Sequence, residues 1–148
     1  MKNAPVRELI TSRKPAACEN DGTVPGWNAY AAQCPTRFVL DRIADKWSVL
    51  ILGAIGRRPL RFNMLLREVE GISHKVLSQT LKRLERDGLL SRTVHPTVPI
   101  SVEYAVTPLG TTLASAVTVV IDWAQDHIEL VMQSQRAYDQ ALLRAQAS

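Results

Sequence analysis

The chain has 148 residues, of which 46% are hydrophobic, and its formal net charge is +4. This length is typical of one domain, and this apolar share is enough to form a core, which excludes a wholly disordered chain. No apolar run approaches the roughly 18 residues of a membrane span, and residues 1–14 lack the apolar segment of a signal peptide, so we expect a cytoplasmic protein with no membrane partner. Two cysteines, Cys18 and Cys34, are too few for a disulfide scaffold.

The positive charge is concentrated in the middle of the chain. Residues 57–95 contain nine basic and four acidic side chains, a net charge of +5. Residues 1–56 contain seven basic and five acidic side chains, a net charge of +2. Residues 96–148 contain two basic and five acidic side chains, a net charge of −3. A basic block on a folded segment is typical of a protein that binds a polyanion, although a merely solvated charged face gives the same pattern.

The chain is predicted to begin with a tail. Residues 1–33 contain three prolines and two glycines and show no sustained apolar period, which predicts a flexible segment. The folded domain is expected over 34–148. Pro35 suits the first turn of a short helix, and apolar residues at three- and four-residue spacing predict a second helix over 46–57. Pro59 ends that helix, and a short extended piece follows.

A short helix, a glycine turn and a longer helix are predicted next. An apolar stripe over 63–69 indicates the short helix, and Gly71 supplies the positive φ that a tight turn requires. Ser73 is a good N-cap for a helix over 73–87, which Gly88 ends. This succession is the helix-turn-helix motif, whose second helix, the recognition helix, enters the major groove of DNA.

The predicted recognition helix divides into two faces. At about 100° per residue, Leu77, Leu81 and Leu84 fall together and predict the buried face. The opposite side carries groups that hydrogen-bond to bases or neutralise phosphates, namely Lys75, Gln79, Lys82 and Arg86, with Ser78 and Arg83 flanking them. Glu85 is expected at the edge of the buried face, away from these groups.

A hairpin and a long helix complete the predicted order. Alternating apolar residues over 89–106, interrupted by two prolines, predict a β-hairpin, which is the wing of a winged helix. Thr107 and Pro108 predict the start of a last helix over 108–141, whose apolar stripe is longer than one compact domain covers and is expected to pack against a second chain. The predicted fold class is therefore mainly α (α+β): a winged helix-turn-helix with a two-stranded wing and a long C-terminal dimerisation helix.

A series of short motifs follows this order of elements. The motifs are Cys34–Pro35, Asp45–Trp47, Leu60–Asn63, Gly71–Leu77, Leu81–Leu89, Val102–Tyr104, Thr107–Gly110 and Trp123. In order and spacing they resemble the HxlR family of winged-helix regulators. The resemblance implies a homodimer, formed by the first and last helices, that presents two recognition helices to a palindromic operator in double-stranded DNA. It also implies a transcriptional repressor or activator and, in several members, a thiol switch at the cysteine before the proline, here Cys34.

DNA contacts are expected from the recognition helix and the wing. We predict that the side chains nearest to base edges are His74, Lys75, Ser78 and Gln79, with Gln79 suited to adenine and Lys75 to guanine. Phosphate contacts are predicted for Arg61, Ser73, Lys82 and Arg83. The wing residues predicted to reach an adjacent backbone or the minor groove are Arg92, His95 and Thr97. The alternative is a winged helix that binds proteins or is purely structural.

Cys34 is the candidate sensor of oxidants or electrophiles. It lies at or just before a predicted helix N-terminus, which stabilises a thiolate, and Arg37 adds positive charge about one turn further on. Cys18 is the candidate to resolve an oxidised Cys34 or to pair with the partner chain's cysteine. A packing role for Cys34 and a bystander role for Cys18 are the alternatives.

Two further classes of function are alternatives to a thiol-switched regulator. A pocket for a small aromatic effector, between the helices that carry Trp47 and Trp123, is the alternative to cysteine chemistry. An enzyme with Cys34 as nucleophile needs a positioned base, and the sequence offers none nearby, so we expect no enzyme and no catalytic residue. No cofactor or metal site is expected either, because metal-ligand spacing is lacking among His74, His95 and His127.

Overall fold

The computed structural model describes residues 27–148 and divides the chain into two compact units. The first unit ends at Ala44 and the second comprises Asp45–Ser148. The predictions for Cys18 and for most of the expected tail concern residues outside the described range. Within that range, no helix is long and apolar enough to cross a membrane.

Helix α2, Thr36–Ala44, belongs to the first unit. A hydrogen-bonded turn precedes it, in which the N–H of Cys34 donates to the carbonyl of Ala31 over 3.1 Å. Within the helix, the guanidinium of Arg42 lies 4.5 Å from the centre of the Phe38 ring, a cation–π pair at the four-residue spacing that brings side chains together on one helix face. The short amphipathic helix expected after Pro35 is therefore present.

Helix α3, Lys46–Ile55, lies at the centre of the core of the second unit. It begins where the side chain of Asp45 accepts a hydrogen bond from the N–H of Trp47, which satisfies one of the unpaired donors of the first turn. Ile51, Leu52 and Ile55 are fully buried against the other helices and the sheet. Each fully buried side chain of this size stabilises the fold by roughly 1.5–3 kcal/mol.

The helix-turn-helix consists of α4, Phe62–Glu68, and α5, His74–Arg86. Gly71 in the connecting turn has a φ of +88°, as predicted, which side chains larger than hydrogen resist. The hydroxyl oxygen of Ser73 accepts from the N–H of Val76 over 3.1 Å, which confirms the predicted N-cap. The residues that α5 buries are Leu77, Thr80, Leu81 and Leu84.

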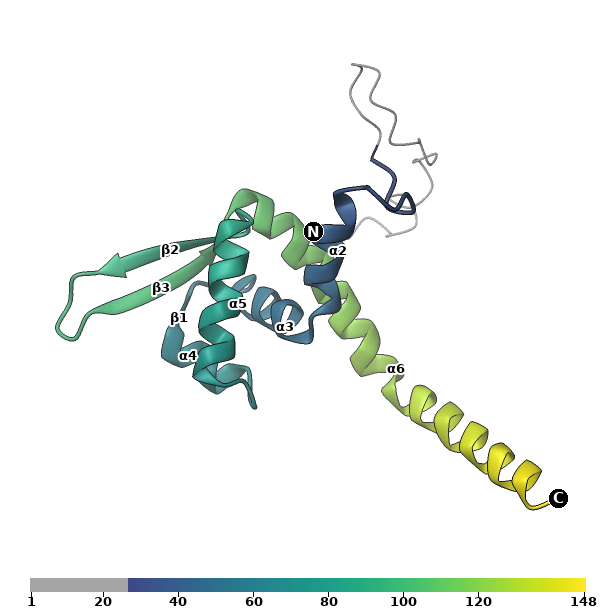
Figure 1. The fold of residues 1–148 in the computed structure, drawn as a ribbon. Coiled ribbons are helices and arrows are strands. Elements are labelled where there is room, and N and C mark those ends of the chain that lie inside the picture. The colour runs from purple at the N-terminus through teal and green to yellow at the C-terminus, as the bar shows by residue number, and fades with distance from the viewer. Residues whose placement is uncertain (1–26) are drawn as a thin grey trace, which may run out of the picture. The chain divides into compact units, whose positions relative to one another are not determined.

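Three antiparallel strands form one sheet in the order β1–β3–β2. Strands β2, Leu90–His95, and β3, Ser101–Val106, form the predicted wing, and Figure 1 shows this hairpin projecting beyond the helices of the unit. The short extended piece before α4 is a third strand, β1, Leu60–Arg61, in which Leu60 pairs with Tyr104. The wing is thus joined to the start of the helix-turn-helix by backbone hydrogen bonds.

Helix α6, Pro108–Gln146, begins as predicted, with Thr107 capping the N–H of Gly110 over 3.0 Å. Its first part packs on α3, whereas every residue from Ile128 onward is exposed, and Figure 1 shows α6 extending past the other elements of the unit. The helix ends at residue 146 rather than at 141, because residues 142–146 are all helix formers. Gly110 lets the start of α6 lie close to the backbone of Leu89, since a Cβ at this position would be 1.8 Å from the carbonyl oxygen of Leu89.

Candidate nucleic-acid interface

The outer face of α5 is polar and basic. The buried leucines fix the rotation of the helix about its axis, so its other side faces away from the core. The exposed side chains on that side are Lys75, Gln79, Lys82, Arg83 and Arg86, and Ser78 is half-buried. This face carries hydrogen-bonding groups and positive charge, which are the two requirements for contacts with bases and phosphates.

The N-terminus of α5 is held by two local contacts. The oxygen of Ser73 is the acceptor in the capping bond, which leaves its hydroxyl proton to donate elsewhere. The ring of His74 lies 5.6 Å from the ring of Phe62, the first residue of α4, at an angle of 38°. Ser73 and His74 are both exposed at the N-terminus of α5, where the helix dipole is positive.

One groove lies between α5 and the wing and has a volume of about 450 Å³. Its lining residues are Phe62, Ser78, Lys82, Glu85, Arg92, Val102 and Tyr104. We call it the α5–wing groove. It brings Lys82 of α5 together with Arg92 of β2, two cations that were predicted separately. Two cations from different elements on one groove suit a phosphate backbone that passes between them.

Glu85 also lines the α5–wing groove, which corrects the expectation that it lies away from the basic patch. The helical period alone places Glu85 at the edge of the buried face. In the fold, β2 packs beside α5, and this edge of the helix consequently faces the hairpin. A carboxylate therefore lies on the same groove as Lys82 and Arg92.

The second groove, of about 610 Å³, lies between the start of α4 and the end of the wing, and we call it the tip groove. Arg61 and Thr97, both predicted DNA contacts, lie on it together. Asn63 and Arg67 line it as well and were not predicted. Their four-residue spacing, which puts both on one face of α4, is the signal that would have identified them.

Thr97 and His95 both make polar contacts within the wing. The hydroxyl of Thr97 donates to the carbonyl of Pro99 over 2.9 Å, and its N–H donates to the carbonyl of His95 over 2.8 Å. The Nε2 atom of His95 is shielded from solvent and lies 3.7 Å from a carboxylate oxygen of Glu103. Thr97 therefore closes the hairpin, and His95 is beside an acid.

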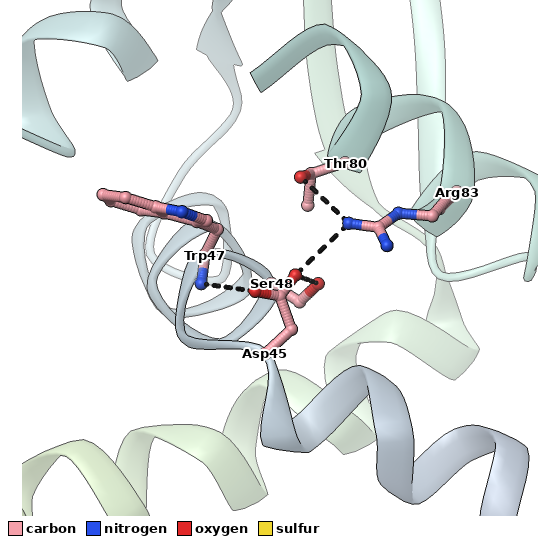
Figure 2. A network of polar contacts seen from close by, with 5 residues as sticks. All are labelled: Asp45, Trp47, Ser48, Thr80 and Arg83. Atoms are coloured by element: carbon pink, nitrogen blue, oxygen red, sulfur yellow. Dashed lines mark hydrogen bonds and ion pairs between the residues drawn. The ribbon is translucent and has the colours of Figure 1, made fainter. Parts of the chain in front are cut away.

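Arg83 joins α5 to the start of α3, as Figure 2 shows. Its guanidinium donates to the Oδ2 atom of Asp45 and to the hydroxyl of Thr80, each over 3.3 Å. Asp45 also accepts from the hydroxyl of Ser48 over 2.9 Å. Because Arg83 is engaged with a carboxylate, a phosphate contact by this residue would compete with the pair.

Cys34 is buried, with 4% of its surface exposed, and lies just before α2. Its sulfur is 3.0 Å from the hydroxyl oxygen of Thr36. The guanidinium of Arg37 donates to the carbonyls of Ala29 and Tyr30, so its polar contacts are with the preceding turn. The predicted position at a helix N-terminus is confirmed, and the cation that was expected to assist it is bound elsewhere.

Trp47 and Trp123, which would border the effector pocket of the alternative to cysteine chemistry, line neither groove. Trp123 is 57% exposed, and its ring stacks on His127 with 4.9 Å between ring centres. The ring of Trp47 lies under the ammonium of Lys46, 4.6 Å away. Among residues 27–148, histidine, cysteine and acidic side chains do not gather into a group of three that could hold a metal.

A helix-turn-helix with a basic outer face, followed by a hairpin that places further cations beside it, defines a winged helix-turn-helix DNA-binding protein. The chain belongs to the HxlR-like helix-turn-helix family, whose model matches residues 42–132.

Relatives and solved structures agree with this assignment. The chain is 42% identical over 105 residues to YtfH of Escherichia coli K12, an uncharacterized HTH-type transcriptional regulator, covering 71% of this chain and 83% of the relative. A solved structure of the transcriptional regulator ytfH from Salmonella typhimurium is 40% identical, with a TM-score of 0.70, and the match covers 74% of this chain and 98% of that one. The redox regulator HypR in its oxidised form is 34% identical, with a TM-score of 0.59 and coverages of 63% and 96%. This protein is a DNA-binding transcriptional regulator of the helix-turn-helix class.

Proposed function

We propose that the chain acts as a homodimer that reads a palindromic operator through α5 and is switched by thiol chemistry at Cys34. The observation that carries the DNA-binding mode is the convergence of Lys82 and Arg92 on the α5–wing groove, beside the polar face of α5. A duplex whose major groove receives α5 has a phosphate backbone on each side of that helix. One of these backbones then runs between α5 and the wing.

The roles of the side chains follow from their positions. The residues proposed to approach base edges are His74, Lys75, Ser78 and Gln79. The residues proposed to contact phosphates, or the neighbouring minor groove from the wing, are Arg61, Ser73, Lys82, Arg83, Arg92, His95 and Thr97. Lys82 and Arg92 are expected to contribute most to phosphate binding because they share one groove. Arg83 and His95 are each beside a carboxylate and are expected to contribute less.

The exposed stripe on α6 supports the homodimer. Apolar residues, interrupted once by Gln135, continue along one side of the helix at alternating four- and three-residue spacing, which is the heptad pattern of a coiled coil. These residues, the α6 seam, are Ala124, Ile128, Val131, Gln135, Tyr138 and Leu142. All six are exposed, and an exposed apolar stripe on a long helix is stabilised when a second helix covers it. A second copy of the chain supplies an identical stripe.

The thiol switch is supported by the position of Cys34 before α2 and by the similarity to a redox regulator. A hydroperoxide would oxidise the Cys34 thiol to a sulfenic acid, with release of water or an alcohol, and a second thiol such as Cys18 would condense with it to a disulfide and a further water. Because Cys34 is buried, the reaction requires the turn before α2 to open. The resemblance to the family implies that the first helix takes part in the dimer, so a change there alters the separation of the two recognition helices.

The DNA-binding mode is tested by the salt dependence of affinity. Contact with about 8 phosphates predicts that log K falls with log salt with a slope near −7. A protein-interaction adaptor built on the same fold would bind DNA weakly and without this steep slope. Fluorescence anisotropy of a labelled duplex from the protein's own upstream region, titrated at four salt concentrations, distinguishes the two.

The thiol switch is tested by the same titration with reduced and mildly oxidised protein. We expect oxidation to change the affinity or the oligomeric state of the wild type and to leave Cys34→Ser unaffected. Equal binding by both forms of the wild type would exclude the switch, and a small aromatic effector would then be the next ligand to screen. Repeated turnover of peroxide with an electron donor, rather than one stoichiometric oxidation, would instead indicate an enzyme.

A further inference from the structure

The end of the wing exposes apolar side chains. Val98 is fully exposed and Ile100 is 71% exposed, with Pro99 between them. Residues 96–100, Pro-Thr-Val-Pro-Ile, contain no charged side chain. Turns at the ends of exposed hairpins are normally polar, because apolar groups there are left in water. These three residues, Val98–Ile100, are called the wing tip below.

The wing tip is held in shape by hydrogen bonds that do not involve Val98 or Ile100. The hydroxyl of Thr97 donates to the carbonyl of Pro99 and lies 3.4 Å from the hydroxyl of Ser101, across the turn. The turn is therefore closed by polar groups, while the apolar side chains point outward. A preorganised surface of this kind loses little conformational entropy when it binds.

The charges around the wing tip indicate the chemistry of its partner. The wing tip lines the tip groove together with Arg61 and Arg67, which are both exposed. Apolar side chains beside two guanidinium groups fit a partner that combines an apolar slot with negative charges at its edges. The minor groove of DNA has this arrangement, since its walls are sugars, its edges are phosphates, and its width of about 6 Å admits single side chains.

We propose that the wing tip is an apolar wedge that enters the minor groove beside the α5 site and bends the duplex, while Arg61 and Arg67 hold the flanking phosphates. Val98 and Ile100 contact sugars and base edges and partly unstack a base step, as apolar wedges in other minor-groove proteins do. The proposal rests on the binding of DNA by α5 described above. It assigns a role to residues beyond the polar wing residues Arg92, His95 and Thr97.

The test compares two pairs of substitutions at the same positions. The probe is a 30-bp duplex, selected by the wild-type protein from a random pool and labelled with a donor and an acceptor dye at its ends. Val98→Ser with Ile100→Ser removes the apolar surface, and Val98→Leu with Ile100→Leu retains it. Circular dichroism verifies that both variants are folded, which is expected because the substituted side chains lie in solvent.

We expect the wild type to bend the duplex by roughly 20–90°, seen as increased energy transfer. The serine variant should bind about tenfold more weakly and leave the duplex nearly straight, with an unchanged salt slope because it loses no phosphate contact. The leucine variant should bend the duplex as the wild type does. A straight duplex in the wild-type complex would overturn the wedge while leaving DNA binding intact, and failure of the wild type to bind any selected duplex would overturn both.

A protein partner for the wing tip is the competing outcome. In that case the serine variant would bind and bend DNA as the wild type does, yet lose regulation in a transcription assay with purified components. That result would overturn the minor-groove assignment.

Discussion

The guanidinium of Arg83 lies 3.3 Å from the carboxylate of Asp45, which also caps α3. The last turn of α5 is thereby tied to the start of α3, the helix at the centre of the core. Both side chains are partly exposed, so solvent screens their attraction, and the ion pair itself stabilises the fold by less than about 1 kcal/mol. Asp45 contributes more to the stability of the fold than Arg83, because it also accepts hydrogen bonds from the N–H of Trp47 and the hydroxyl of Ser48.

The two residues should therefore differ in their effect on stability. Asp45→Ala is expected to lower the free energy of unfolding by about 1–2 kcal/mol, since it removes an N-cap together with the ion pair. Arg83→Ala should lower it by less than about 1 kcal/mol. Urea unfolding followed by circular dichroism measures both, and Arg86→Ala, on the exposed face, is the control. An equal loss from both substitutions would mean that the ion pair outweighs the cap.

Gln79 and Lys82 should affect DNA binding in different ways. Lys82→Ala is expected to weaken binding on all sequences and to make the salt slope about one unit shallower, because one phosphate contact is lost. Gln79→Ala should lose about 1–3 kcal/mol of discrimination at particular base pairs only. Binding to a set of singly substituted operators distinguishes these effects. If Gln79→Ala weakens every sequence alike, Gln79 does not read a base.

Glu85→Gln is expected to strengthen DNA binding. The carboxylate lines the α5–wing groove with Lys82 and Arg92, where it repels an approaching phosphate. Removing its charge while keeping its size should raise affinity several-fold at low salt and less at high salt, because the repulsion is screened. The matched control is Glu70→Gln, in the turn before α5. A similar gain from both variants would mean that only net charge matters.

The α6 seam predicts opposite results for two adjacent leucines. Leu142 lies on the seam and is 44% exposed, whereas Leu143 lies beside it and is 66% exposed. Leu142→Lys is expected to raise the dissociation constant of the dimer at least about tenfold, since each helix then presents a charge to an apolar seam. Leu143→Lys should change it by less than about twofold. Sedimentation equilibrium gives both constants, and equal effects would contradict the seam.

Gly110→Ala is expected to destabilise the second unit strongly. The added methyl group would lie 1.8 Å from the backbone oxygen of Leu89, which cannot rotate away. Overpacking of this kind is expected to lower the free energy of unfolding by about 3 kcal/mol or more. Thr112→Ala, on the exposed side of the same helical turn, should change it by less than about 0.5 kcal/mol. Thermal unfolding of the two variants tests this difference.

The elements that the sequence predicted well are those with a local signal. The buried leucines of α5 recur at the helical period, and Ser73 and Thr107 cap as their residue types favour. The positive φ of Gly71 follows from the same local reasoning. These features need no knowledge of distant residues.

The features that the sequence did not predict depend on contacts between distant residues. The extended conformation of β1 was predicted, but its pairing with β3 was not, because the partner segment lies more than forty positions later. The Asp45–Arg83 pair joins residues 38 positions apart. Glu85 faces a groove only because the hairpin packs beside α5. Helical periodicity describes one element at a time and has no information about such neighbours.

The central position of β3 in the sheet has a mechanical consequence. This strand pairs with β2 in the wing and with β1, which continues directly into α4. The hairpin therefore cannot pivot at its base without breaking the bonds of Leu60 and Arg61. The spacing between the helix-turn-helix and the wing is therefore fixed, and a duplex that contacts both must conform to that spacing.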